Sequence, residues 1–298
     1  MSQELKRNCL YYQIGGLTIQ VEADLPFQES TFVPKFKKFM VHQPGQERVV
    51  IRHHFGFPKI TEEKVGPKVY EFPPWLIRWS GEKWYYFGYS PWEHKNLYLL
   101  AIVSPDYRQI DIFHRSEENF LRGGLPALTA FPTDQVLLAR VFPSLQGAYF
   151  HGAGIIFERK GLIFLGQSGQ GKSTITKFFM AYPQAKILCD DRIILRRQQS
   201  KWMIYGTWSH GEIPEVAPDA APLTGLYFLQ KASKNRLSSL KSPFEVFKRL
   251  VDLLVRPHPT PNWWEKVISL CQSLAHEVPA YELEFNLDGS VVELFKEI

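Results

Sequence analysis

The sequence predicts an α/β protein: a domain with a central mixed sheet and flanking helices, preceded by a β-rich N-terminal domain. Two observations predict this fold class. Residues 1–112 contain many short segments rich in Val, Ile and aromatic residues, separated by Gly or Pro. Further along, the apolar run 161–165 enters a glycine-rich segment, and apolar residues then recur at helical spacing through 174–180.

The N-terminal half is expected to consist of strands. Segments 10–14 and 17–22 flank Gly15-Gly16, which is a strong signal for a two-residue hairpin. Six further strands are predicted at 48–54, 69–72, 76–79, 83–87, 97–103 and 109–113. The aromatic residues between Trp75 and Trp92 are expected to pack in a core rather than to line a binding groove.

The second half begins after a Gly- and Pro-containing junction, so we expect domains at 1–120 and 121–298. A helix is predicted at 133–142 with Thr133 as its N-cap. Three strands joined by tight turns (148–151, 154–159 and 162–165), a helix from the glycine-rich segment to about Tyr182, and two strands (185–189 and 193–197) should follow.

The C-terminal third carries clear helix starts. Ser242-Pro243-Phe244-Glu245 is a capping box with proline at the first helical position. Asn262, with Glu265 three residues later, predicts a second helix. The chain should end in a hairpin of 280–286 and 291–295 around Asp288-Gly289.

The length, composition and net charge of the chain limit its possible functions. The chain has 298 residues, 45% of them hydrophobic, and its net charge of +5 is too small to indicate a nucleic-acid partner. Its three cysteines are far apart, as expected for reduced thiols in a cytoplasmic protein. No apolar run approaches the length of a membrane span or of a signal peptide. The sequence does not decide the oligomeric state.

The glycine-rich segment fits G-x-x-x-x-G-K-[S/T], the P-loop pattern, and its flanking strand and helix are the context in which this motif binds phosphate. Lys172 should reach the β- and γ-phosphates of ATP, and the Ser173 hydroxyl should ligate Mg²⁺. The predicted ATP-binding residues are Gly166, Gln167, Ser168, Gly169, Gln170, Gly171, Lys172, Ser173 and Thr174.

Phosphoryl transfer also needs a metal ligand and a group that deprotonates the nucleophile. Asp190-Asp191 ends a strand soon after the P-loop helix, and we expect that strand to lie beside the P-loop strand, with its carboxylates facing Mg²⁺. A solvated turn is the alternative. His151 ends another strand and becomes a candidate beside these acids.

Lys and Arg are frequent between residues 231 and 256. We interpret Lys248 and Arg249 as a solvated helix face. Arg236, which follows a strand and a loop, is the candidate for stabilising charge on the γ-phosphoryl group.

The order of His151-Gly152, the P-loop and Asp190-Asp191-Arg192 resembles the HPr kinase superfamily, to which ATP-dependent phosphoenolpyruvate carboxykinase is structurally related. The tail is similar to HPr-kinase-related proteins found beside genes for modified peptides, including kinases that phosphorylate a serine of a lasso-peptide precursor. The features behind this second likeness are Phe131-Pro132-Thr133-Asp134, the segment 206–212, Pro222-Leu223 and the strand 226–229.

The resemblance covers about 130–298 and implies an HPr-kinase-like domain. It also implies that Asp190 is the general base, with His151 beside it, and that Asp191 is a Mg²⁺ ligand; the two aspartates can exchange roles. Glu212 is either a second acid near the metal or part of a surface loop. The signature segment of bifunctional HPr kinases is not visible, and residues 1–120 show no resemblance that we can place.

The expected function is an ATP- and Mg²⁺-dependent kinase that phosphorylates a serine or threonine hydroxyl of a protein or peptide. The β-rich N-terminal domain would help to recognise the acceptor. A nucleotide-binding module without transfer and a carboxykinase-like enzyme acting on a small molecule are the alternatives.

Overall fold

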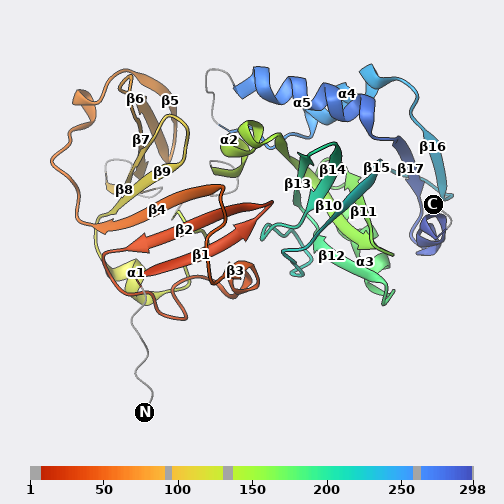
Figure 1. Cartoon of the computed structure of the whole chain (residues 1–298), viewed down its shortest axis with the longest axis horizontal. Coiled ribbons are helices and arrows are strands. Elements are labelled where there is room, and N and C mark those ends of the chain that lie inside the picture. Colours follow the sequence, from red (N-terminus) through yellow and green to blue (C-terminus); the bar gives the residue numbers. More distant parts are fainter. Residues whose placement is uncertain (1–7, 91–95, 130–136, 258–262, 297–298) are drawn as a thin grey trace, which may run out of the picture. The chain divides into compact units, whose positions relative to one another are not determined.

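The computed structural model describes residues 8–90, 96–129, 137–257 and 263–296 (Figure 1). The chain divides into two compact units, Met1–Leu137 and Leu138–Ile298. This division lies later in the chain than the predicted boundary after residue 120. Phe32 forms a β-bridge with Leu125, and a ring nitrogen of His53 lies 2.9 Å from the carbonyl oxygen of Leu128. Residues 121–129 thus pack with the first unit.

The first unit is built on one nine-stranded mixed sheet. Its strands are β1 (Cys9–Ile14), β2 (Leu17–Ala23), β3 (Met40–Val41), β4 (Arg48–Phe55), β5 (Lys68–Phe72), β6 (Trp75–Trp79), β7 (Trp84–Tyr89), β8 (Leu97–Val103) and β9 (Gln109–His114). Their order is β3-β1-β2-β4-β9-β8-β7-β6-β5, and β4 is parallel to both β2 and β9. Short helices lie at Pro34–Phe39, Glu62–Lys64 and α1 (Glu118–Arg122).

The predicted strands of this unit are confirmed, including the first hairpin. Gly15 and Gly16 both have positive φ, as a type I′ turn requires, and they join Ile14 to Leu17 in register. The aromatic residues pack as expected: Trp84 is buried, and its ring centroid lies 4.4 Å from that of Trp79. Trp92 lies outside the described residues.

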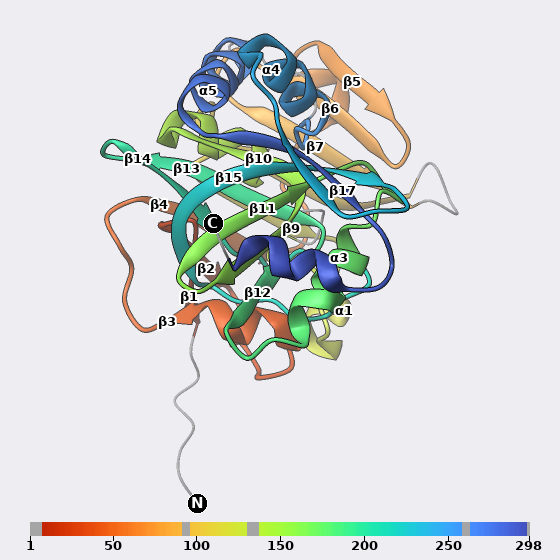
Figure 2. The ribbon, with the colours of Figure 1, turned by 90° about the vertical axis from the view of Figure 1, so that its right-hand side faces the viewer.

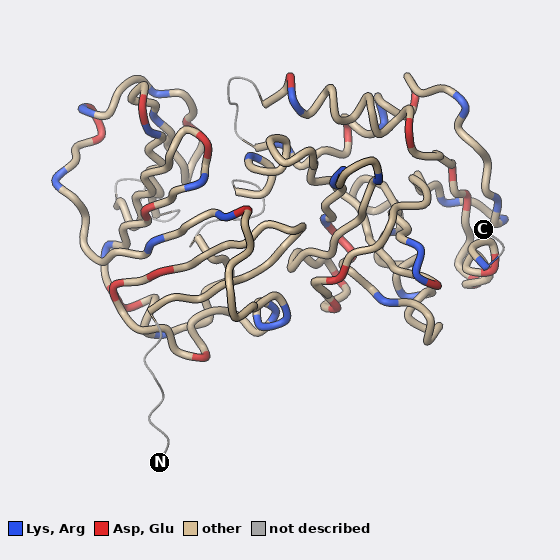
Figure 3. Tube along the Cα trace, viewed as in Figure 1, with Lys and Arg blue, Asp and Glu red and all other residues tan. Residues whose placement is uncertain are grey.

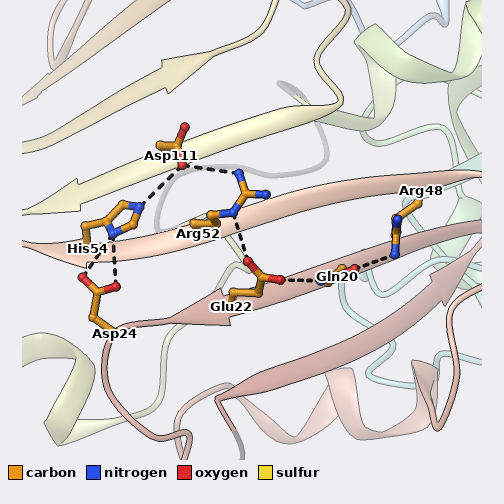
Figure 4. Close-up of polar contacts among 7 residues, drawn as sticks. All are labelled: Gln20, Glu22, Asp24, Arg48, Arg52, His54 and Asp111. Carbon is orange, nitrogen blue, oxygen red and sulfur yellow. Dashed lines mark hydrogen bonds and ion pairs between the residues drawn. The ribbon is translucent and has the colours of Figure 1, made fainter.

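A ladder of polar side chains runs across β2, β4 and β9 (Figure 4). Nε of Arg52 donates to Glu22 at 3.0 Å, and Nη1 of Arg52 lies 3.6 Å from Asp111. Glu22 and Asp111 are the direct register partners of Arg52 on the two neighbouring strands. Opposite charges in register favour the parallel order β2-β4-β9 over shifted pairings.

On the face of the sheet opposite this polar ladder, side chains of β4 and β9 are buried. His53 and His114 lie in an aromatic core beside Phe120, and their ring nitrogens are 2.8 Å apart. The other nitrogen of His53 contacts a carbonyl oxygen, which only an N–H can satisfy, so in a neutral pair His114 donates to His53. Burial lowers the pKa of His53 to about 3 and that of His114 to about 4.

The second unit is built on an eight-stranded mixed sheet. Its strands are β10 (Gly147–Phe157), β11 (Lys160–Leu165), β12 (Ala185–Cys189), β13 (Arg192–Gln198), β14 (Lys201–Tyr205), β15 (Ala220–Lys231), β16 (Arg236–Ser239) and β17 (Ala280–Phe285). β10 pairs with β13 along its first half and with β11 and β12 along its second half. β15 pairs in turn with β14, β11 and β17. The strands β10, β13, β14, β15 and β11 therefore form a closed ring, in which each strand pairs with the next and β11 pairs with β10.

Helices cover both faces of this sheet (Figures 1 and 2). One face carries α3 (Lys172–Met180) and the 3-10 helix Ser290–Phe295, and Phe179 and Phe295 pack there against Phe164. The other face carries α4 (Pro243–Asp252) and α5 (Trp263–Glu277). α2 (Ala139–Val141) and a 3-10 helix, Phe142–Leu145, precede β10.

The predicted α4 start is confirmed, because Oγ of Ser242 accepts from the backbone N–H of Glu245 at 3.3 Å. The predicted N-caps Thr133 and Asn262 lie outside the described residues, as does the segment 131–134.

Three predictions about strands are wrong. Residues 148–159 do not form two strands: β10 continues through Gly152 and Gly154, and Gly154 instead gives room to the side chain of Ile193. β12 does not lie beside the P-loop strand, because β10 and β15 are the neighbours of β11. The final hairpin is absent: after β17 the chain forms a 3-10 helix, which buries Val291, Val292 and Phe295 on the α3 face.

None of the helices in the described part of the chain is long and apolar enough to cross a membrane. Basic and acidic residues are interspersed along the chain (Figure 3).

Candidate functional site

The P-loop has the local structure that its sequence predicts. β11 ends at Leu165, six residues form the loop, and α3 starts at Lys172. Gly171, the residue before α3, has φ 100°, and a Cβ there would lie 2.5 Å from the ring of Phe285. Only glycine meets both conditions at this position.

Lys172 folds back over the start of the loop. Its Nζ donates to the carbonyl oxygens of Gly166 at 2.9 Å and of Gln167 at 3.1 Å. Burial lowers the pKa of Lys172, while the carboxylates of Asp191 and Asp190 act in the opposite direction. The ammonium group therefore lies at the mouth of the loop, within the electrostatic reach of both acids.

Ser173 connects the P-loop to the acid pair. Its hydroxyl donates to Oδ2 of Asp190 at 2.9 Å. Asp190 is buried, with 1% of its surface exposed, and it accepts two backbone N–H groups: Gly211 at 2.5 Å and Ile213 at 3.0 Å. Three donors around one buried carboxylate fix its position. The two motifs meet although β12 does not lie beside β11.

The loop between β14 and β15 makes this clamp. Thr207 donates to the carbonyl oxygen of Arg192 at 2.6 Å and accepts from the backbone N–H of Ser209. A Cβ on Gly211 would lie 3.2 Å from Asp190, so the close approach of this backbone suits glycine. Sequence reasoning missed these donors, because a backbone N–H has no signature; the run Gly206-Thr207 to Gly211 was the available signal.

Asp191 faces a different environment from Asp190. About 30% of its side chain is exposed, and Nε of Arg192 lies 3.2 Å from its Oδ2 without hydrogen-bond alignment. The backbone N–H of Gly152 donates to the carbonyl oxygen of Asp191 at 2.9 Å, which brings β10 and the acid pair together. The side chain of Asp191 is thus accessible, and its main chain is held by β10.

His151 belongs to this group. Its backbone N–H donates to the carbonyl oxygen of Leu253 at 2.7 Å. Burial lowers the pKa of its half-buried ring, Arg192 and Lys172 lower it further, and Asp191 acts to raise it. A lowered pKa leaves the imidazole neutral near pH 7, so it is able to accept a proton.

Two predicted site residues form ion pairs outside the group around Ser173 and Asp190. The side chain of Glu212 is 73% exposed and pairs with Lys177 at 3.3 Å, although its neighbours Gly211 and Ile213 both donate to Asp190. Arg236 begins the edge strand β16, is 68% exposed and forms an ion pair with Glu284. The structure does not bring Arg236 into contact with the P-loop.

The loop residues differ in what they contact. Gln170 accepts from the backbone N–H of Gln167, and Gln167 donates to the carbonyl oxygen of Asp252 at 3.2 Å. Ser168 and Gly169 are exposed at the tip of the loop, and Thr174 lies half-buried in the first turn of α3.

The side-chain oxygen atoms of Ser173 and Asp190 are suited to bind a divalent cation. A hydroxyl and a carboxylate oxygen 2.9 Å apart are both hard oxygen ligands of the kind that Mg²⁺ takes. Within the described residues, no cluster of three or more His, Cys, Asp or Glu side chains is arranged to hold a metal ion.

No protein-family model matches the chain, and no curated protein matches it in sequence. Among solved structures, the HPr(Ser) kinase/phosphatase from Coxiella burnetii is similar at 8% sequence identity with a TM-score of 0.30. The alignment covers 50% of this chain and 96% of that protein. A TM-score at this level is too low to assign the fold, so the site is interpreted from its own geometry.

Proposed function

We propose that this protein is an ATP- and Mg²⁺-dependent kinase that transfers the γ-phosphoryl group to a serine or threonine hydroxyl of a protein or peptide. The observation that carries the proposal is the 2.9 Å hydrogen bond between Ser173 and Asp190. It joins a P-loop to an acid pair, and a P-loop Ser with a strand-end Asp is the Mg²⁺-binding pair of P-loop phosphotransferases. The order of His151, P-loop and Asp190-Asp191 that resembles HPr kinases also supports it.

The contacts favour one assignment of the two aspartates. Asp190, which is buried and bonded to Ser173, suits the metal side. Asp191, which is accessible and close to His151, suits the general base. These roles are the reverse of those that the resemblance implies, in which Asp190 is the general base and Asp191 is the Mg²⁺ ligand. When bound, Mg²⁺ would neutralise charge on the β- and γ-phosphates.

The remaining residues act on the phosphoryl group and the proton. The acceptor oxygen forms a bond to the γ-phosphorus, the bond from the γ-phosphorus to the β–γ bridging oxygen breaks, and ADP leaves. The acceptor proton passes to Asp191, with the neutral ring of His151 beside it. Lys172 binds the β- and γ-phosphates, and Arg192, which is paired with Asp191, takes the place of Arg236 as the candidate for stabilising charge on the transferred group.

Incubation of the purified protein with γ-labelled ATP and serine-containing peptide pools tests this function. Asp191→Asn should lower transfer by about 10²–10⁴, the contribution of a general base, and leave Mg²⁺-ATP affinity unchanged. Binding without transfer in the wild-type protein would favour a non-catalytic module. Transfer confined to small metabolites would favour a carboxykinase-like enzyme.

A further inference from the structure

A pocket of about 520 Å³ opens beside the P-loop in the second unit. Its lining comes from the loop (Gly166, Gln167), from β15 (Phe228, Gln230) and from the end of α4 (Asp252). A volume of this size suits a few residues of peptide or a nucleoside. Nothing in the proposed phosphoryl transfer yet uses this pocket.

The pocket adjoins the reacting groups at the first residues of the loop. The side chain of Gln167 donates to the carbonyl oxygen of Asp252 at 3.2 Å, which joins the loop to the end of α4. Leu253, also part of the lining, accepts the backbone N–H of His151 at 2.7 Å. The pocket thus lies next to both the start of the P-loop and His151.

The direction of the triphosphate follows from Lys172. In a P-loop the lysine reaches the β- and γ-phosphates, and Nζ of Lys172 lies against the carbonyl oxygens of Gly166 and Gln167. The γ-phosphate end of ATP therefore belongs at the start of the loop, where the pocket begins. The nucleoside is attached to the other end of the phosphate chain and therefore extends away from this pocket.

The α4 side of the pocket favours a cation near Asp252. The guanidinium of Arg249 is already paired with Glu282 at 3.1 Å and with Glu245 at 2.6 Å. The C-terminus of α4, with its partial negative charge, ends at the pocket. The carboxylate of Asp252 is 74% exposed, and its nearest cation, Arg256, lies 3.8 Å away.

Three glutamines (167, 170 and 230) give the pocket side-chain amides, which both donate and accept hydrogen bonds. The groups of a peptide backbone need both functions. Lys231, at the end of β15, and Arg249 are the cations of the lining and equal in number its two carboxylates, Asp252 and Glu282, so the preference for a cation is local to the Asp252 end of α4.

We propose that this pocket binds the acceptor, as a peptide segment with a Lys or Arg side chain close to its hydroxyl. The basic side chain lies against Asp252, and the glutamine amides hold the peptide backbone. This inference rests on the proposed kinase function and names the acceptor class.

Peptide pools with a fixed serine, flanked either by Lys and Arg or by Asp and Glu, test the specificity with γ-labelled ATP. The wild-type protein should phosphorylate the basic pool at least tenfold faster. Asp252→Asn should remove this preference, and Asp252→Lys should invert it, each with unchanged affinity for a fluorescent ATP analogue. Glu158→Gln is the control, an exposed acid in the turn at the opposite ends of β10 and β11. A preference that survives in both Asp252 variants overturns the inference.

Blocking the pocket separates failure of this inference from failure of the proposed function. Gln230 is exposed, so Gln230→Cys is accessible to N-ethylmaleimide in a Cys9→Ser background. Burial raises the pKa of the Cys189 and Cys271 thiols to about 12, so those two residues stay unlabelled.

Labelling should abolish transfer to peptides and leave affinity for the ATP analogue within twofold. Loss of that affinity would assign the pocket to the nucleoside and overturn the inference, whether or not any peptide pool is phosphorylated. Unaltered transfer after labelling would overturn it as well. A wild-type protein that binds no ATP, by contrast, refutes the proposed function itself.

Discussion

Exchange of one oxygen for an NH₂ group at Asp190 should destabilise the second unit, whereas the same exchange at Asp191 should not. Oδ1 of Asp190 accepts from Gly211, and Oδ2 accepts from Ile213 and Ser173. In Asp190→Asn one of these positions becomes an N–H donor that faces a backbone N–H. A buried N–H left without an acceptor costs about 1–3 kcal/mol. For a unit of this size, about 2 kcal/mol lowers the melting temperature by roughly 4–8 °C.

Differential scanning calorimetry without nucleotide measures this effect. The matched control is Asp191→Asn, in which the partly exposed, poorly aligned ion pair to Arg192 is weakened, worth about 0–1 kcal/mol. Ser173→Ala removes one donor and leaves both backbone N–H groups bonded, so its effect should lie between the two. Equal melting temperatures for the two Asn variants would refute the proposal that backbone donors hold Asp190.

The remaining predictions concern stability. Because burial lowers the pKa of His53 to about 3 and that of His114 to about 4, unfolding takes up protons below the ordinary pKa of about 6.5. The free energy of unfolding of the first unit should thus be constant above pH 7 and fall below pH 6.5 by about 1.4 kcal/mol per pH unit for each ring. Urea titrations of the wild-type protein and of His114→Phe at several pH values measure this dependence. An equal pH slope in both proteins would contradict the prediction. Ser242→Ala should cost about 1 kcal/mol through the lost N-cap of α4, with Ser242→Gly costing less; chemical denaturation checks the order. A double-mutant cycle on Glu22 and Arg52 should give a coupling of about 0.2–1 kcal/mol that salt reduces, and zero coupling at low salt would contradict the register argument.

Local patterns predicted most of the elements. The Gly15-Gly16 turn, the strands of the first unit and the α4 capping box depend on neighbours in sequence, and the structure has them within about two residues. The break predicted after His151 failed because glycine in a strand also marks a close approach, here of Ile193. The final hairpin failed because Val291, Val292 and Phe295 contact the α3 face, and that packing overrides their β-propensity.

The site was predictable as a set of side chains but not as an arrangement. The P-loop pattern and the acid pair were visible, and the structure brings Ser173 and Asp190 into contact. The proposed division of roles was not visible, because it depends on backbone donors from a loop 21 and 23 residues further along the chain. Arg249, assigned to a solvated face, instead lines the pocket beside the P-loop, because the register of α4 on the sheet decides which side chains turn inward.

The Mg²⁺ dependence of ATP binding tests the central claim most directly. Isothermal titration calorimetry of ATP, with and without Mg²⁺, should give a wild-type affinity that Mg²⁺ raises by about tenfold or more, equivalent to at least about 1.4 kcal/mol. In Asp190→Asn most of this increase should disappear while the Mg²⁺-free affinity stays, because Lys172 and the loop amides are intact. No measurable ATP affinity in the wild-type protein, or an undiminished Mg²⁺ effect in Asp190→Asn, would contradict a phosphotransfer site built on Ser173 and Asp190.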